Sequence, residues 1–168
     1  MPRVVLHQPE IPPNTGNVAR TCAATGSSLH LIHPLGFSLE DRHLRRAGLD
    51  YWPWVQLREH ASWRAFISFR NAHPGRLLAF SRHSQRPYHE IAYRSDDWLL
   101  FGCESSGLPE ELLAAADARL TIPMPGAVRA GGGVRSLNLS VAVGIVVFEA
   151  LRQLSPAGPT GQGERGVT

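Results

Sequence analysis

Short apolar segments alternate with longer amphipathic ones along most of the chain. The apolar segments are rich in Val, Leu, Ile and Phe and end at polar or turn-forming residues, which is typical of buried strands. They occupy residues 4–7, 29–32, 55–57, 76–80, 98–101 and 120–122. Because strands that alternate with helices usually form a parallel sheet, the pattern predicts an α/β fold with a mostly parallel sheet and helices on both faces.

The amphipathic segments between these strands predict helices. The first should begin near Thr15, with Asn14 or Thr15 as its N-terminal cap, and end at Gly26. Residues 38–47 combine a serine cap, early acidic residues and late arginines, so they predict a short helix with a basic end. Further helices are predicted at residues 62–71, 110–116 and 137–154.

The last predicted helix is apolar nearly all round. It has at most about 18 residues and contains Asn138, Glu149 and Arg152, which argues against a membrane span. Packing against a partner subunit fits it better. The chain should therefore form one domain over residues 1–154, and the Pro- and Gly-rich residues 155–168 should be a disordered C-terminal tail.

Composition limits the class of protein. With 168 residues, of which 43% are hydrophobic and 18% charged, the chain has the composition of a soluble globular protein. Cys22 and Cys103 form no CxxC pair and the histidines show no metal-ligand spacing, so neither a disulfide nor a metal site is predicted. The N-terminus lacks the long apolar core of a signal peptide, so we expect a cytoplasmic protein.

The basic residues are all of one kind. The net charge of +3 and the pI of about 9.4 permit a polyanionic partner without requiring one. All 17 basic residues are arginine, whose guanidinium group suits phosphate contacts and stacking on bases better than an ammonium group does. Codon bias in a GC-rich genome explains this preference equally well, so the charge alone does not decide the partner.

Turns at the ends of two strands are the strongest local signal for a ligand. No GxGxxG motif follows the first strand, and the sequence contains neither GxxxxGK[ST] nor GxSxG, which disfavours ordinary nucleotide sites and an α/β-hydrolase. Residues 102–109 and 123–133 instead form turns rich in glycine or proline, where bare backbone amides can contact a ligand. This pattern predicts a small molecule held by the main chain.

Individual candidate residues have structural as well as chemical interpretations. The helix start at Asn14 could bind phosphate or could simply be a cap. Glu104, directly after a strand, could be a base, a partner for an amine or a surface acid. Ser136 and Asn138 could be no more than caps of the last helix. Cys103 fits a packing role better than a nucleophilic one, because no base is visibly paired with it.

Three segments in combination are more informative than any one of them. They are NTGNVAR at residues 14–20, LFGCESSGLP at 100–109, and IPM at 122–124 together with RSLNLSVA at 135–142. Their combination and order resemble the three motifs of the SPOUT methyltransferases. Residues 3–154 closely resemble the TrmL-like, or YibK-like, tRNA (cytidine/uridine) 2′-O-methyltransferases, which act on the wobble nucleotide. The alternatives are the same reaction at another tRNA or rRNA nucleotide and a catalytically silent RNA-binding protein.

The resemblance implies a fold, a cofactor and an assembly. The C-terminal part would form a deep trefoil knot, a rare exception to the rule that chains are unknotted. S-adenosylmethionine would lie bent in the knot, tRNA would be the substrate, and two subunits would form a homodimer in which each completes the other's active site. The implied cofactor-binding residues are Phe80, Gly102, Glu104, Ile122, Met124, Ser136 and Leu137.

The resemblance also implies catalytic and RNA-binding residues. Arg20, Ser136 and Asn138 would be catalytic, and the arginine is assigned to the ribose hydroxyl. Because a guanidinium group stays protonated in proteins, we expect Arg20 to orient that hydroxyl and stabilise developing negative charge, while an RNA phosphate or water accepts the proton. The residues expected to contact RNA are Asn14, Arg20, Arg42, Arg45, Arg46, Arg129 and Arg135.

Three features depart from the family pattern. Cys103 stands where relatives usually have proline, which would loosen the loop around it. Phe148 replaces a tyrosine found in some relatives, so a hydroxyl contact from the last helix is lost. The glycine-rich loop at residues 125–134 is several residues longer, so cofactor entry or the contact with RNA could differ.

Overall fold

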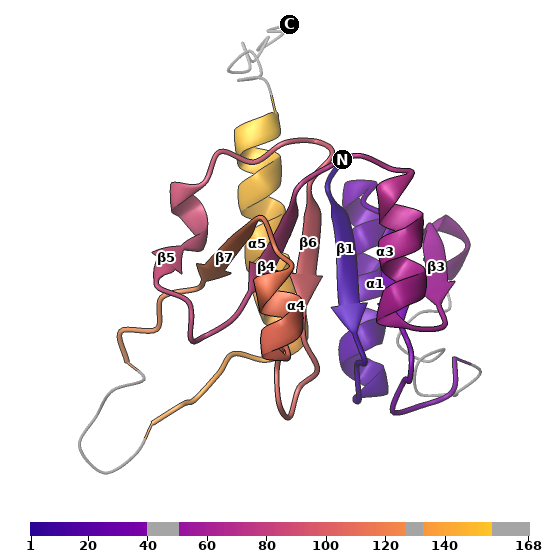
Figure 1. Ribbon diagram of the computed structural model, residues 1–168, viewed down its shortest axis with the longest axis horizontal. Coiled ribbons are helices and arrows are strands. Elements are labelled where there is room, and N and C mark those ends of the chain that lie inside the picture. The colour runs from indigo at the N-terminus through magenta and orange to yellow at the C-terminus, as the bar shows by residue number, and fades with distance from the viewer. Residues whose placement is uncertain (40–50, 127–132, 156–168) are drawn as a thin grey trace, which may run out of the picture.

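A single parallel sheet organises the molecule. The computed structural model describes residues 1–39, 51–126 and 133–155, and within them seven parallel strands follow the order β3-β2-β1-β6-β4-β7-β5 (Figure 1). The predicted parallel sheet is therefore confirmed. The strands are β1 (Arg3–His7), β2 (Leu29–Ile32), β3 (Leu57–His60), β4 (Leu77–Phe80), β5 (Arg86–Pro87), β6 (Trp98–Phe101) and β7 (Ala118–Thr121).

Helices cover both faces of this sheet, as predicted. α1 (Pro12–Thr25) and α5 (Leu139–Leu154) pack against each other on one face, and α3 (Trp63–Asn71) and α4 (Glu110–Ala114) lie on the other (Figure 1). Two short 3-10 helices, η1 (Trp52–Trp54) and η2 (Tyr88–Glu90), connect strands. Among the described residues, no helix has the length and hydrophobicity needed to cross a membrane.

Alternation along each strand divides the interior into two cores. Successive side chains of a strand point to opposite faces. Val4 and Leu6 therefore join the core under α1 and α5, whereas Val5 joins the core under α3 and α4. All of these side chains are fully buried, which explains why the central strands are continuously apolar in sequence.

The start of α1 differs from the prediction. The helix begins at Pro12 with Ile11 as its N-cap, so neither Asn14 nor Thr15 is the cap. Proline suits the first helical turn because the amide hydrogen that it lacks would have no partner within the helix there. The side chain of Asn14 is consequently available for contacts elsewhere. The predicted end at Gly26 is confirmed, and this residue has a positive φ of 68°.

Other elements differ from prediction at their ends. β3 begins at Leu57 because η1 and the turn after it occupy residues 52–55. α5 begins at Leu139, with Asn138 as its N-cap, and β7 starts two residues earlier than expected because Ala118 pairs with β4. β5 was not predicted, since it contains only two residues, one of them proline. The predicted helix at 38–47 and tail at 155–168 lie mostly outside the described residues.

One side of α5 is exposed. Its buried side faces the sheet and α1. On the opposite side, the exposed fraction is 49% for Val141 and 57% for Phe148, seven residues apart and so on one face of the helix. Exposed large apolar groups on a regular helical face are typical of a surface that another molecule covers. The buried residues of α5 are Leu139, Val143, Val146, Val147 and Ala150.

A pair of histidines is buried under α3. His30 Nδ1 and His60 Nε2 are 2.9 Å apart, and the two rings stack with their centroids 5.2 Å apart. Phe66 and Trp98 pack edge-on against this pair. Burial, reinforced by the neighbouring charges of His60 and Arg58, lowers the pKa of His30 to about 3, and burial also lowers the pKa of His60.

We predict that this pair makes the fold sensitive to acid. In the unfolded chain both rings bind protons below a pKa of about 6.5, whereas the folded chain keeps His30 neutral down to about pH 3. The unfolded state therefore binds more protons, and the free energy of unfolding should fall by about 2 kcal/mol between about pH 7.5 and pH 5. Urea unfolding at the two pH values measures this loss, and the exposed-ring variant His89→Gln should show the same loss. Equal unfolding free energies at both pH values would contradict it.

Candidate functional site

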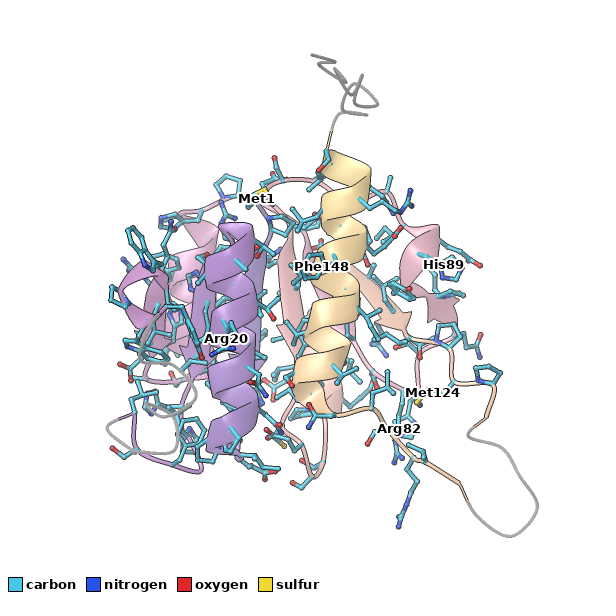
Figure 2. All side chains as sticks on the ribbon, turned by 180° about the vertical axis from the view of Figure 1, so that it is seen from behind. Met1, Arg20, Arg82, His89, Met124 and Phe148 are labelled. Carbon is cyan, nitrogen blue, oxygen red and sulfur yellow. The ribbon has the colours of Figure 1, made fainter. Side chains whose placement is uncertain are left out.

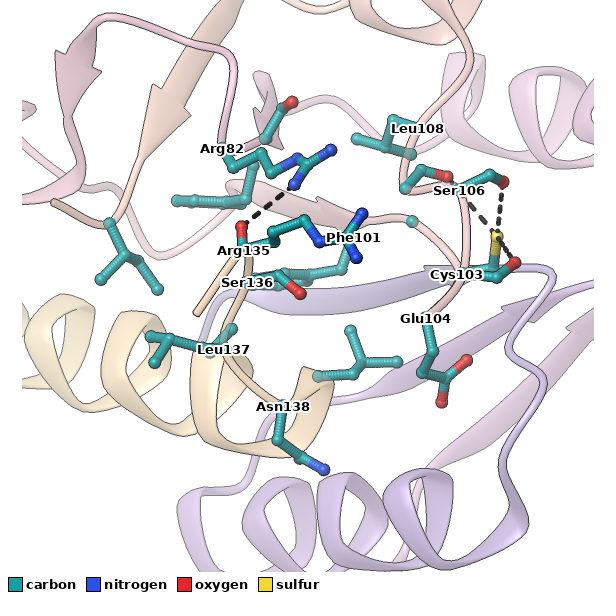
Figure 3. A pocket seen from close by; sticks show the side chains of 18 of the residues that line it. Arg82, Phe101, Cys103, Glu104, Ser106, Leu108, Arg135, Ser136, Leu137 and Asn138 are labelled. Atoms are coloured by element: carbon teal, nitrogen blue, oxygen red, sulfur yellow. Dashed lines mark hydrogen bonds between the residues drawn. The ribbon is translucent and has the colours of Figure 1, made fainter. Parts of the chain in front are cut away.

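A cavity of about 570 Å³ opens at the carboxyl ends of β4, β6 and β7. Parallel strands end at the same edge of a sheet, so the loops after them meet there, as in ligand sites of other α/β proteins. The segment that leads into α5 and the first turn of α1 complete the walls (Figure 3).

The structure brings together most of the residues singled out in the sequence. All seven implied cofactor-binding residues line the cavity, and so do Asn14, Arg135 and Asn138. The apolar part of the wall includes Phe80, whose ring stacks on that of Phe101 with centroids 4.7 Å apart. Thus segments separated by more than a hundred residues in the chain form one concave surface.

The loop after β6 presents main chain to this cavity because it turns back on itself very tightly. Gly102 lies very close to the backbone of residues 107–108 at the end of the loop. A Cβ atom on Gly102 would be 2.1 Å from the carbonyl carbon of Gly107 and 2.4 Å from the nitrogen of Leu108. Only glycine fits that approach. Gly107 has a φ of 72°, and its backbone N–H donates to the carbonyl of Cys103 over 3.0 Å.

The carboxylate of Glu104 fixes the loop before α1 to the loop after β6. It accepts hydrogen bonds from the backbone N–H groups of Glu10 (2.7 Å) and Ile11 (3.3 Å) and from the side-chain amide of Asn14 (3.0 Å). In return, the carboxylate of Glu10 accepts from the backbone N–H (2.9 Å) and hydroxyl (2.7 Å) of Ser105. The surface-acid interpretation of Glu104 is therefore wrong, because its oxygens are held by three donors.

The hydrogen bonds continue from Asn14 to α5. The Asn14 side-chain oxygen accepts from the side-chain amide of Asn138 over 2.8 Å. The side-chain oxygen of Asn138 in turn accepts from the backbone N–H of Ser140 (2.9 Å) and from its hydroxyl (2.7 Å). Asn138 therefore caps α5, as its structural interpretation predicted, and also joins the other two motifs. We call the series Glu104, Asn14, Asn138 the polar relay.

Arg20 lies apart from the cavity of its own chain. It is exposed on the outer surface of α1, and its guanidinium carbon is 4.7 Å from the centroid of the Tyr51 ring. The Tyr51 hydroxyl donates to the carbonyl of Gly16 over 2.6 Å, which anchors that ring on α1. Figure 2 shows Arg20 on the same side of the molecule as Phe148 of α5.

Comparison with known proteins places this arrangement in a family. A model of the SpoU rRNA Methylase family matches residues 1–148, most of the chain. The chain belongs to this family. The family resemblance inferred from the three motifs is thereby confirmed, and the cavity of this SpoU methylase is built by the same motifs.

Individual relatives of this SpoU methylase are close. The tRNA (cytidine(34)-2′-O)-methyltransferase of Burkholderia cenocepacia is 50% identical over 152 residues, which cover 89% of this chain and 94% of that protein. A solved structure described as concerning 2-OH methylation of C/U34 on tRNA is 55% identical with a TM-score of 0.83, covering 92% of this chain and 96% of that one. An AdoMet-bound rRNA methyltransferase from Sinorhizobium meliloti is 30% identical with a TM-score of 0.80, covering 92% and 57%.

The cavity of this SpoU methylase also contains residues that the sequence did not single out. They are Arg82 and His83, just after β4. Cys103, which the sequence analysis had considered, lines the cavity as well. Burial raises the pKa of the Cys103 thiol, but hydrogen bonds from Ser106 and Ser105 outweigh it, so the pKa is lowered overall. The polar residues directly after the β4 strand were the available signal for Arg82.

Within the described ranges no three His, Cys, Asp or Glu side chains could hold a metal ion. Four arginines predicted to contact RNA lie outside those ranges: Arg42, Arg45, Arg46 and Arg129.

The polar relay predicts that Glu104 stabilises the fold as well as the site. Glu104→Gln replaces one accepting oxygen by an amide that donates, so at least one of the three donors loses its partner. The free energy of unfolding should fall by about 1–3 kcal/mol. Urea unfolding checks this, with Glu110→Gln as the control because its exposed ion pair with Arg119 should contribute little. Equal free energies of unfolding for the two variants would show that the hydrogen bonds of Glu104 do not stabilise the fold.

Proposed function

We propose that this SpoU methylase transfers a methyl group from S-adenosylmethionine to the ribose 2′-hydroxyl of nucleotide 34 of tRNA, in the cytoplasm. The observation that carries the proposal is the cavity in which the three motifs converge. The tRNA (cytidine(34)-2′-O)-methyltransferase of Burkholderia cenocepacia, at 50% identity, favours this substrate over rRNA, since the rRNA methyltransferase from Sinorhizobium meliloti is 30% identical.

The residues present fit S-adenosylmethionine. The cavity volume of about 570 Å³ lies within the range of small-molecule pockets. Phe80, Ile122 and Leu137 offer apolar surface for the adenine ring, and the tight turn at Gly102 offers bare backbone groups for polar parts of the molecule. When bound, the cofactor supplies a sulfonium methyl group that a hydroxyl oxygen can attack.

The proposed role of the protein is to position that hydroxyl. The polar relay holds the three loops at fixed distances around the cavity, and positioning of this kind can supply a large part of a rate enhancement. Arg20 donates hydrogen bonds to the ribose oxygen and stabilises the negative charge that develops as it attacks. The proton passes to an RNA phosphate or water, because the guanidinium group is already protonated.

This role requires a second subunit, because Arg20 does not line the cavity of its own chain. We propose a homodimer that buries the exposed face of α5 and brings Arg20 of the partner subunit to each cavity. Val141, Ile145 and Phe148 give that face its apolar character, and Gly144 lies among them. A symmetric dimer buries the same face of both copies.

We also propose that the C-terminal segment is knotted, as the family implies. The connection between β4 and β6, residues 81–97, contacts the chain just before α5 and again in the last turn of α5, which supports this topology. Arg82 Nη1 donates to the carbonyl of Arg135 over 3.2 Å, and the backbone N–H of Tyr93 donates to the side chain of Gln153 over 3.0 Å. Tracing the chain through an experimental electron-density map would test it.

Methylation of total tRNA tests the function. Purified protein, S-adenosylmethionine with a labelled methyl group and tRNA from a strain lacking the enzyme should give label at the 2′-oxygen of nucleotide 34. Label at another nucleotide, or in rRNA only, would move the activity to a different site. No label in either RNA would leave a silent RNA-binding protein and refute the proposal.

Replacement of Arg20 separates chemistry from cofactor binding. Arg20→Ala should lower kcat about 10²- to 10³-fold, as expected for loss of a donor to a developing oxyanion. The Kd for S-adenosylmethionine should stay within twofold, because Arg20 is absent from the cavity wall of its chain. Single-turnover methylation and calorimetric titration measure the two quantities, with Arg64→Ala on α3 as an exposed-arginine control. Loss of cofactor binding in Arg20→Ala would assign this residue a structural role.

Replacement of Gly144 tests the dimer. A Cβ atom at Gly144 meets no atom within 4 Å in the chain, so Gly144→Glu should fold as a monomer. A charge in the centre of the proposed interface should nevertheless halve the mass measured by sedimentation and abolish methylation. Ala65→Glu, at an exposed position of α3, should leave both unchanged. A Gly144→Glu protein that keeps both its mass and its activity would exclude this interface.

A further inference from the structure

Two arginines from different segments lie together on one side of the cavity. Arg82 lies two residues after the end of β4 and Arg135 precedes α5, and both are exposed residues of the cavity wall. They are joined by the hydrogen bond from Arg82 Nη1 to the carbonyl of Arg135 (Figure 3). Neither forms an ion pair with any carboxylate in the part of the chain that the structure describes.

The guanidinium group of Arg82 is held in a fixed orientation. Its Nε donates to His83 Nε2 over 3.1 Å while Nη1 donates to the Arg135 carbonyl over 3.2 Å. Among the contacts of the described residues, Nη2 of Arg82 has no partner, so one edge of a preoriented group remains for a ligand. The Glu104 carboxylate forms none of the ion pairs of the described residues, and its three hydrogen bonds hold it on another wall of the cavity (Figure 3).

Two guanidinium groups on one wall of a cavity, neither paired with a carboxylate, give that wall a positive charge that an anion can offset. A phosphate group is an anion that matches their shape, since guanidinium donors bind its oxygens in a bidentate manner. The substrate under the proposed function carries a phosphate at the required place. Its 2′-hydroxyl is on the carbon next to the one bearing the 3′ phosphate, so a ribose presented to the cavity brings that phosphate with it.

We propose that Arg82 and Arg135 clamp the phosphate on the 3′ side of the target nucleotide. The proposal rests on the proposed function and adds Arg82 to the substrate-binding residues. A phosphate contact fixes the register of the nucleotide without reading its base. The clamp therefore presents the ribose to the cavity whichever base is attached, and base selection lies elsewhere.

Variants at Arg82 test the clamp by RNA binding. A fluorescent anticodon stem–loop is titrated with protein between about 50 and 200 mM salt. Arg82→Gln should bind about tenfold more weakly, and the slope of log K against log salt should decrease by about 0.7–0.9, the value for one phosphate contact. Arg82→Lys keeps the charge without the fork and should fall between. Arg86→Gln is the matched control, since Arg86 is exposed on the same connection, binds the Glu90 carbonyl and does not line the cavity.

Neutralising the phosphate itself gives a second, independent test. The test compares two stem–loops that both carry a 2′-deoxy nucleotide 34, one with an ordinary phosphate on its 3′ side and one with a methylphosphonate there. The methylphosphonate stem–loop should bind the wild-type protein about tenfold more weakly, because one charged contact is lost. Arg82→Gln should show no further loss from the same change. A methylphosphonate on the 5′ side should affect both proteins equally.

Three results would overturn the clamp. In the first, the methylphosphonate weakens RNA binding by Arg82→Gln as much as it weakens binding by the wild-type protein. In the second, Arg82→Gln binds RNA as tightly as the wild type. In the third, Arg82→Gln binds S-adenosylmethionine more weakly while its RNA binding is unchanged. The last result would mean that Arg82 only holds the segment before α5 over the cofactor. Failure of the proposed function looks different, because the wild-type protein would then not methylate tRNA, whereas failure of the clamp alone leaves that activity intact.

Discussion

The polar relay is the interaction on which the site depends. It joins residues that are 90 and 124 positions apart in the chain, and each member has both of its polar ends occupied by another member or by backbone. One such bond contributes only about 1 kcal/mol, but a half-buried donor or acceptor left without a partner costs about 1–3 kcal/mol. Loss of any one member therefore disturbs the other two, and the three loops keep their positions as a unit.

The parallel sheet makes this relay possible, and the layer of α1 and α5 uses it. Parallel strands deliver their loops to one edge, and both helices of the layer begin there, at Pro12 and Leu139. Their first turns contact the cavity while their outer surfaces carry Arg20 and Phe148 (Figure 2). The same two helices thus connect the cavity to the surface proposed for the second subunit.

Much of this could be predicted from local sequence, and the rest could not for physical reasons. The buried strands and the end of α1 at Gly26 follow from hydrophobic pattern and residue type, whereas the seven predicted cofactor-site residues that line the cavity follow from the family resemblance of the three motifs. The prediction that Asn14 caps α1 was wrong, because its residue type suits a cap, whereas its side-chain partners lie about a hundred residues away in the chain. Arg82 was missed for a related reason, since its hydrogen bond to Arg135 spans 53 residues.

The position of Arg20 would give the proposed dimer a functional meaning. On the proposed mechanism a single chain holds the complete wall for the methyl donor but lacks the arginine at the reacting oxygen. Cofactor binding would then be a property of the monomer, whereas methyl transfer would need the dimer. Because the exposed face of α5 is apolar, association of two subunits through it would rely on removal of apolar surface from water, and on the proposed mechanism methyl transfer would depend on that association. On the same proposal, the contact of Arg20 with the Tyr51 ring would orient its guanidinium group before RNA binds.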